Sequence, residues 1–304
     1  MSRVSVVIPS RNELFLPQTV DDVLAKARGD VEVIPVLDGY RPDPPLREDS
    51  RVRPIFFPPG DDRKSRMRQA INAGVEAATG EYVMKLDAHC MMAEGWDEAL
   101  KADCEEDWIV VPRRYSLEPS NWSIRAHRPF VDYEYVSFPY TTEFLTVKWG
   151  NKWWARQKER ADVLVDENMA FQGSCMFMRK SLFERLGPLQ VEGYGGFILD
   201  SEEMSNKCWL SGGRVLTNKK TWYAHLHKGA EFGRMYFINK WELRRGRKFH
   251  HDFWMHDRWP KATRKFEWLV EHFWPVPGWP EDWRDPKYEA EYLRKLNAEP
   301  AGEE

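Results

Sequence analysis

Stretches of β-branched residues alternate with amphipathic segments through the N-terminal part of the chain. The sequences VSVVIPS at 4–10 and VEVIPVLDG at 31–39 are almost continuously apolar, as in strands that are buried on both faces. Segments 16–28 and 64–79 place apolar residues three or four positions apart, which is typical of helices that cover a sheet. Because strand, helix and strand in succession form a parallel pair with a right-handed crossover, the sequence predicts an α/β fold with a Rossmann-like, mostly parallel sheet and flanking helices.

The rest of the chain predicts further elements and one long irregular segment. We expect helices over 94–104, 180–186 and 200–211, a strand that ends at Asp87, and strands over 52–57, 108–112, 174–179 and 214–218. Residues 113–168 are polar and aromatic without a clear period, and such segments are often functional, so we expect a lid or acceptor-binding insertion there. The sequence thus predicts one domain over 1–229 and a helical, tryptophan-rich extension over 230–304 that packs on it.

Composition limits the partners and the cellular compartment that we expect for the protein. The 304 residues carry a net charge of -3, which gives no overall electrostatic reason to expect nucleic acid as a partner. No apolar run approaches the length that crosses a bilayer, so we expect no membrane span. The four cysteines are widely spaced without a CxxC pattern, which favours reduced, buried thiols. These features predict a cytoplasmic protein.

The sequence LDAHC at 86–90 places a carboxylate and an imidazole close together at a strand end. Alternate side chains of a strand point to the same side, so Asp87 and His89 can bind one divalent cation together. The alternative is that both are solvated turn residues, which is commoner for such a tripeptide on its own. Because the carboxyl ends of parallel strands meet at one edge of the sheet, we expect Asp87 to lie near Asp38 and near the loop after the first strand.

Four segments together resemble one enzyme family. They are VSVVIPSRNE at 4–13, NAGVEAATGEYVMKLDAHC at 72–90, QGSCMFMRKSLFERLG at 172–187 and YGGFILDSEEMSNKCWLSGG at 194–213. In order and spacing they resemble glycosyltransferases of family 2 with the GT-A fold, and their motifs are closest to the polypeptide N-acetylgalactosaminyltransferases. In those relatives a glycine pair is followed twelve residues later by a metal-binding histidine, and here Gly213 is followed at that distance by His225.

The resemblance implies a transferase that moves a sugar from a nucleotide sugar, with a UDP-sugar as the expected donor, to a hydroxyl acceptor. It implies a divalent cation, Mn²⁺ before others, bound by Asp87, His89 and His225, with His227 as the alternative to His225. Donor contacts are expected from residues near the sheet edge: Pro9, Arg11, Glu13, Asp38, Arg66, Arg68, Gly173 and Ser174. The base that takes the acceptor proton is expected among three acids, in this order of preference: Asp200, Glu203 and Glu202.

Structural explanations for several of these residues stay open. Acids in the first turn of a helix also complement its dipole, and a single arginine can simply be a solvated surface residue. Leu37 stands where relatives often have the first acid of a pair, so only Asp38 is left to contact the base or ribose.

The acceptor and some alternative functions are also open. The tail carries a basic and aromatic run that could stack on sugars or bases and contact phosphates: Arg234, Tyr236, Trp241, Arg244, Arg245, Arg247, Lys248, Trp254 and Trp259. Glycans, small molecules and modified DNA bases are candidate acceptors. A nucleotide-sugar-binding protein without turnover and a nucleic-acid-binding module are alternatives. A nucleotidyltransferase is disfavoured, because the loop SRNELFLP at 10–17 has no glycine to approach a phosphate.

Overall fold

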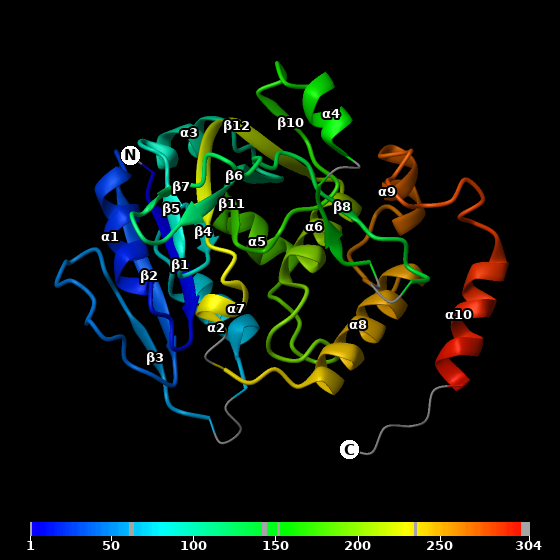
Figure 1. Cartoon of the computed structure of the whole chain (residues 1–304), viewed down its shortest axis with the longest axis horizontal. Helices are drawn as coiled ribbons and strands as arrows, with labels where there is room; N and C mark the ends of the chain where they lie inside the picture. The colour runs from blue at the N-terminus through cyan, green and yellow to red at the C-terminus, as the bar shows by residue number, and fades with distance from the viewer. Residues whose placement is uncertain (1, 61–63, 142–144, 151–152, 234–235, 299–304) are drawn as a thin grey trace.

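The structure, a computed structural model, describes residues 2–60, 64–141, 145–150, 153–233 and 236–298 (Figure 1). The strands of the main sheet are β1 Val4–Ser10, β2 Val31–Asp38, β3 Ile55–Phe57, β4 Tyr82–Leu86, β5 Cys90–Met92, β6 Trp108–Glu118, β7 Ser123–Ile124, β10 Val165–Glu167, β11 Cys175–Arg179 and β12 Arg214–His225. Their order is β10-β12-β6-β11-β4-β1-β2-β3, with β5 paired to β12 and β7 paired to β6. A second, two-stranded sheet consists of β8 Tyr135–Val136 and β9 Val147–Lys148.

The N-terminal half of the sheet is parallel, as the apolar runs predict. Strands β4, β1, β2 and β3 are parallel neighbours, and every residue of β1 and β2 is buried. Strand β11 lies antiparallel between β4 and β6, while β12 is parallel to β6. The predicted α/β class, with a Rossmann-like sheet and flanking helices, is therefore confirmed, and β11 is its central antiparallel strand.

Helices cover both faces of this sheet. They are α1 Leu16–Lys26, α2 Met67–Ala77, α3 Trp96–Ala102, α4 Trp154–Glu159, α5 Lys180–Leu186, α6 Asp200–Leu210, α7 Gly229–Phe232, α8 Lys240–Met255, α9 Phe266–His272 and α10 Pro286–Ala298. Helices α1 and α3 share one face, where Trp96 Nε1 donates to the Val23 carbonyl at 3.3 Å. The crossover from β3 to β4 runs across the sheet in the opposite direction to that from β1 to β2, so its right-handedness places α2 on the other face.

Three predicted strands have different lengths in the structure. Strand β6 continues to Glu118, so the start of segment 113–168 belongs to the sheet, and β12 continues to His225. Both continuations carry charged residues that hide the strand pattern; Arg113, for example, pairs with Asp132 at 2.7 Å. The strand predicted over 52–57 contains only β3, and Val52 makes an isolated bridge.

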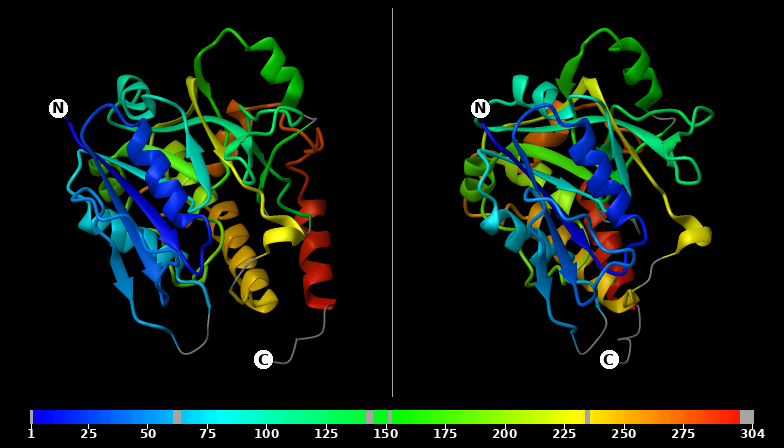
Figure 2. Two further views of the ribbon diagram at one scale, coloured as in Figure 1. Left: turned by 60° about the vertical axis from the view of Figure 1, so that its left-hand side comes forward. Right: turned by 90° about the vertical axis from the view of Figure 1, so that its left-hand side faces the viewer.

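The tryptophan-rich extension packs on the sheet domain. Figures 1 and 2 show α8, α9 and α10 on the side of the molecule away from α1, β2 and β3. Trp254 Nε1 donates to the Tyr194 hydroxyl and Trp279 Nε1 to the Val136 carbonyl, both at 2.9 Å. Trp254 and Trp259 are buried in the same cluster as the sheet, so these two members of the predicted binding run cannot stack on a ligand. Arg234, from the same run, lies outside the described residues.

All four cysteines are free and buried, which confirms their predicted state. Within the described ranges, no helix combines the length and the apolar character needed to cross a membrane.

Candidate active site

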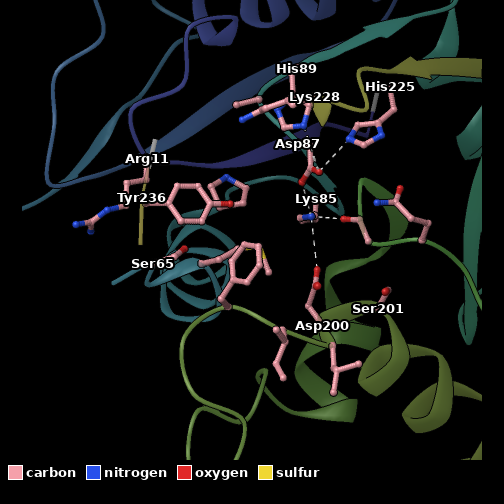
Figure 3. A pocket seen from close by; sticks show the side chains of 18 of the residues that line it. Arg11, Ser65, Lys85, Asp87, His89, Asp200, Ser201, His225, Lys228 and Tyr236 are labelled. Atoms are coloured by element: carbon pink, nitrogen blue, oxygen red, sulfur yellow. Dashed lines mark hydrogen bonds and ion pairs between the residues drawn. The ribbon is translucent and has the colours of Figure 1, made fainter. Parts of the chain in front are cut away.

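A cavity of about 750 Å³ opens where β1, β2 and β4 end (Figure 3). Its wall also includes the end of β12, the segment before α6 and part of the C-terminal extension. The structure brings most predicted site residues into this wall: Pro9, Arg11, Glu13, Asp38, Asp87, His89, Gly173, Asp200, Glu202 and His225. Four others lie outside the lining: Arg66, Arg68, Ser174 and Glu203.

Asp87, His89 and His225 meet at one place in the cavity wall. Asp87 Oδ2 lies 3.4 Å from His225 Nε2 and 3.9 Å from His89 Nε2. One possible ligand atom from each of the three residues lies within 4.8 Å of the others. Figure 3 shows both imidazoles beside the Asp87 carboxylate. Residues that are far apart in the sequence thus form a compact group of one oxygen and two nitrogen donors.

The backbone that places this group differs from the sequence prediction. We expected Asp87 and His89 to share one side of a strand, but β4 ends just before them and both lie in the turn that leads to β5. The Asp87 N–H donates to the Ser174 carbonyl at 2.8 Å, which ties this turn to the start of β11. Antiparallel pairing of β5 with β12 then brings His225 next to the turn. Turn geometry, and not strand alternation, therefore produces the group.

The chemistry of the group fits a transition-metal cation. One carboxylate and two imidazoles suit Mn²⁺ better than Ca²⁺ or Mg²⁺, which favour shells of oxygen. Both ring nitrogens of His225 are buried without a hydrogen-bond partner in the described part of the chain. Burial lowers the pKa of His225 to about 3, so the ring is neutral near pH 7 and can donate a lone pair. His227, the alternative ligand, lies 3.1 Å from Arg114 Nη1, which favours His225.

Glu13 and Lys228 lie behind His89. Glu13 Oε2 is 3.4 Å from His89 Nδ1, and Glu13 Oε1 accepts a hydrogen bond from the Lys228 ammonium. A carboxylate at Nδ1 orients the ring so that Nε2 faces the position of a cation. Glu13 lines the cavity, and its carboxylate contacts the His89 ring and accepts a hydrogen bond from Lys228. Lys228, which follows His225 by three residues, was not predicted from the sequence.

Asp38 organises two arginines at another part of the wall. Its Oδ2 is 3.0 Å from Arg11 Nη1 and its Oδ1 is 2.7 Å from Arg66 Nε. The backbone N–H of Arg66 also donates to Oδ2 at 3.0 Å. These contacts fix both guanidinium groups at the ends of β1 and β2, beside Pro9. Arg66 itself is outside the lining, but it directly follows Ser65 in the chain, and Ser65 lines the cavity.

Arg68 and Glu203, predicted as a donor contact and as a candidate base, are buried together outside the cavity lining. The Arg68 guanidinium is fully buried, donates to the carbonyl oxygens of Gln190 (at 2.8 Å) and Ile198, and pairs with Glu203. Glu203 also lies 2.6 Å from the Lys207 ammonium. Neither side chain reaches the cavity, because buried partners occupy both. The placement of both side chains away from the cavity is unfavourable to the predicted roles of Arg68 as a diphosphate contact and of Glu203 as a base.

Asp200 and Glu202, at the start of α6, both line the cavity but differ in their partners. Glu202 Oε1 accepts from the Val147 N–H at 3.0 Å and Oε2 from the Ser201 hydroxyl at 2.8 Å. Burial raises the pKa of the Glu202 carboxyl, even though both hydrogen bonds lower it. Asp200 Oδ2 has no hydrogen-bond partner among the described residues. Asp200 is therefore the freer acid of the two.

Gly173 and Ser174 follow one another but have separate positions. Gly173 lines the cavity, and a Cβ atom there would lie 3.0 Å from Asp200 Oδ1, so glycine leaves room for that carboxylate. Ser174 is buried, and its Oγ lies 2.8 Å from the Tyr223 hydroxyl. The Ser174 carbonyl accepts from the Asp87 N–H, and the expected contact of Ser174 with a donor sugar stays a prediction.

Lys85 is a central cavity residue that the sequence analysis missed. It precedes Asp87 by two positions at the end of β4, and its ammonium lies 2.7 Å from Asp87 Oδ1. Burial alone would lower the pKa of Lys85, but Asp87 and Asp200 raise it above the ordinary value. Burial alone would likewise raise the pKa of Asp87, but Lys85 and the two histidines hold it well below its usual range. Its spacing of two residues from Asp87 was the sequence signal that could have predicted this position for Lys85.

Aromatic and basic residues form another part of the wall: Trp149, His227, Tyr236 and Arg247. The Trp149 side chain is 44% exposed, and its ring stacks against His227 with 6.0 Å between ring centroids. The Arg114 guanidinium lies 4.7 Å from the Trp149 ring centroid. Tyr236 and Arg247 come from the predicted basic and aromatic run, whereas no sequence signal distinguished Trp149 from the other tryptophans.

This is an α/β fold of the GT-A type, and its cavity places one carboxylate, two imidazoles and a pair of arginines at the carboxyl ends of the strands. The chain belongs to glycosyl transferase family 2, whose sequence model matches residues 5–187. The predicted family and the predicted enzyme class, glycosyltransferase, are thereby confirmed.

Similar proteins carry related names. A Drosophila melanogaster protein named as polypeptide N-acetylgalactosaminyltransferase 13 is 27% identical over 234 residues, which is 70% of this chain and 40% of that protein. A Caenorhabditis elegans protein named N-acetylgalactosaminyltransferase 8 is 32% identical over 172 residues, 51% of this chain and 36% of its own. This chain thus spans less than half the length of these relatives.

The solved structures include a similar fold. The crystal structure of GalNAc-T7 with UDP, GalNAc and Mn²⁺ superposes with a TM-score of 0.63 and 16% sequence identity, covering 90% of this chain and 56% of that one. At this identity the likeness shows the shared GT-A fold.

Proposed function

We propose that the chain transfers a sugar from a UDP-sugar to a hydroxyl acceptor in a reaction that depends on a divalent cation, Mn²⁺. The observation that carries this proposal is the meeting of Asp87, His89 and His225 within 4.8 Å, in a cavity that also contains Asp38 and Arg11. The neighbouring fold of GalNAc-T7 was solved with UDP and Mn²⁺, which supports the same ligand classes here.

In this proposal the three residues hold the cation, which as a Lewis acid would stabilise the charge on the departing diphosphate. Glu13 keeps His89 oriented, and Lys228 adds a positive charge beside the same position. Arg11 and Arg66, fixed by Asp38, offer planar paired donors to the nucleotide.

Asp200 is the proposed base for the acceptor proton. Its carboxylate faces the cavity next to Gly173, whereas Glu202 is bonded to Val147 and Ser201 and Glu203 is buried with Arg68. A general base needs an oxygen within hydrogen-bond reach of the hydroxyl, and Asp200 Oδ2 can provide it, because among the described residues it makes no hydrogen bond and lies 3.5 Å from the Lys85 ammonium.

The domains of the chain would contribute different parts of the cavity. We propose residues 1–229 as the catalytic domain, with segment 113–168 contributing Thr146, Val147 and Trp149 to the acceptor side of the cavity. The extension 230–304 would close that side through Tyr236 and Arg247. The cytoplasmic location expected from the sequence stays a prediction.

The test is hydrolysis and transfer of nucleotide sugars with and without Mn²⁺, preceded by a thermal-shift screen of nucleotides. We expect UDP and Mn²⁺ together to raise the melting temperature, and Asp87→Ala to reduce turnover at least about 100-fold, more than loss of an outer-shell partner. Asp21→Ala, on the exposed side of α1, is the matched control and should behave as wild type. Wild-type turnover by Asp87→Ala would contradict the cation role, and a UDP shift without turnover would favour the binding-protein alternative.

A further inference from the structure

Lys85 lies between two carboxylates in the floor of the cavity. Its ammonium nitrogen is 2.7 Å from Asp87 Oδ1 and 3.5 Å from Asp200 Oδ2, and it donates to the Gly173 carbonyl. Figure 3 shows this nitrogen between the carboxylates of Asp87 and Asp200. Lys85 is buried, and its ammonium makes two hydrogen bonds, to Asp87 and Gly173, and a longer ion pair with Asp200.

The ammonium divides the two oxygens of Asp87 between different neighbours. Oδ1 faces Lys85, whereas Oδ2 faces the Nε2 atoms of His225 and His89 at 3.4 and 3.9 Å. Only one oxygen of Asp87 is therefore directed at the cation position. Asp200 does not belong to the group of three residues whose atoms converge there.

Asp200 would otherwise be a suitable fourth ligand. Its Oδ2 is buried and makes no hydrogen bond within the described residues, and the missing side chain of Gly173 lets the carboxylate come close to the backbone. Two neighbouring carboxylates repel each other unless a positive charge lies between them. A divalent cation could supply that charge as well as an ammonium does.

We propose that Lys85 is a positioning residue that keeps Asp200 out of the ligand set of the cation and holds it at the sugar end of the cavity. The proposal rests on the proposed function, because it takes Asp87, His89 and His225 as the cation site. Lys85 also places a positive charge beside this site, which weakens cation binding before a nucleotide diphosphate is present. Lys85 thus leaves Asp87 as a ligand of the cation and Asp200 as the base.

The test measures Mn²⁺ affinity of the full chain without nucleotide, by calorimetry and by electron paramagnetic resonance of free Mn²⁺. We expect Lys85→Met to bind Mn²⁺ about tenfold tighter than wild type or more, and to lose donor turnover, because Asp200 joins the cation. Adding Asp200→Asn to Lys85→Met should remove the part of this gain that Asp200 supplies, so the double variant should bind Mn²⁺ more weakly than Lys85→Met, and equal affinities would overturn the proposal. Lys220→Met, at an exposed lysine of β12, is the control and should leave the affinity unchanged. Unchanged or weaker Mn²⁺ binding by folded Lys85→Met would overturn the proposal.

A second variant covers the case in which Lys85→Met does not fold. Asp200→Asn alone should leave Mn²⁺ affinity unchanged while turnover falls, and a fall in affinity would overturn the proposal by showing that Asp200 is already a ligand. The proposed function fails separately, if wild-type protein does not turn over any nucleotide sugar with Mn²⁺. A wild-type protein that does not bind Mn²⁺ at all would overturn both.

Discussion

Glu202 illustrates how the properties of a single side chain depend on what surrounds it. It is one of three acids of the same chemical type in the first turn of α6. Its two oxygens accept hydrogen bonds from the Val147 N–H and the Ser201 hydroxyl. Burial raises the pKa of this carboxyl above its ordinary value of 4.5. The folded protein therefore retains a proton on Glu202 at pH values where the unfolded chain has lost it.

This raised pKa predicts a pH-dependent gain from Glu202→Gln. The wild-type contribution is fully present below about pH 4.5 and is lost as pH rises through the folded pKa, so neutral glutamine should be favoured at higher pH. We expect the variant to be more stable than wild type at pH 7, with the advantage disappearing near pH 4. Urea unfolding at the two pH values checks this. Glu184→Gln, at an exposed carboxylate of α5, should show no such difference.

Helices α2 and α6 are joined through a buried ion pair that also holds the loop between α5 and α6. Arg68 of α2 contacts Glu203 of α6 and the carbonyl oxygens of Gln190 and Ile198. This loop leads directly into Asp200, so the pair supports the position of the proposed base. The Arg68–Glu203 pair therefore helps to hold α2, α6 and the loop before Asp200 in place around the cavity.

Removal of one partner of this pair should destabilise the protein strongly. We expect Arg68→Met to cost about 3–5 kcal/mol in urea unfolding, because it leaves the Glu203 charge buried without its guanidinium. The double variant Arg68→Met/Glu203→Met should lose less than the sum of the single variants. Arg66→Met is the comparison for the effect on unfolding. It changes a partly exposed arginine at the N-cap of α2, two positions before Arg68. If Arg68→Met kept its stability and lost only nucleotide binding, the diphosphate contact first expected for Arg68 would be restored.

The C-terminal extension and the cavity wall are linked through the small sheet of β8 and β9. Trp279 donates to the Val136 carbonyl of β8, and β8 pairs with β9, which contains the cavity residue Val147. The Trp279 ring also packs edge-on against Phe138, with 5.2 Å between centroids. The extension thus supports the side of the cavity that we assign to the acceptor.

Loss of the Trp279 side chain should therefore affect both stability and acceptor use. We expect Trp279→Ala to lower the free energy of unfolding by about 3–5 kcal/mol, and to raise the acceptor KM more than the donor KM, because the wall at Val147 loosens. Trp274→Ala, at a tryptophan that is 39% exposed, should change stability by less than about 1 kcal/mol. Equal effects of the two substitutions on unfolding would contradict the supporting role of Trp279.

Local pattern by itself determined the α/β class, most elements and the convergence of Pro9, Asp38 and Asp87. Almost continuous apolar runs specify the buried strands, apolar residues three or four positions apart specify the helices, and parallel strands must present their carboxyl ends at one edge. The family motifs added His225, whose partner in space is more than a hundred residues away.

Tertiary structure alone decided which acids and bases are free to act. Arg68 and Glu203 carry the same charges as Arg11 and Asp200, but burial against each other removes them from the cavity. Lys85 gains its position from β4 and β11 together, since its three partners lie on separate segments. Charge is a property of a residue, whereas desolvation and pairing depend on neighbours that only the folded chain supplies.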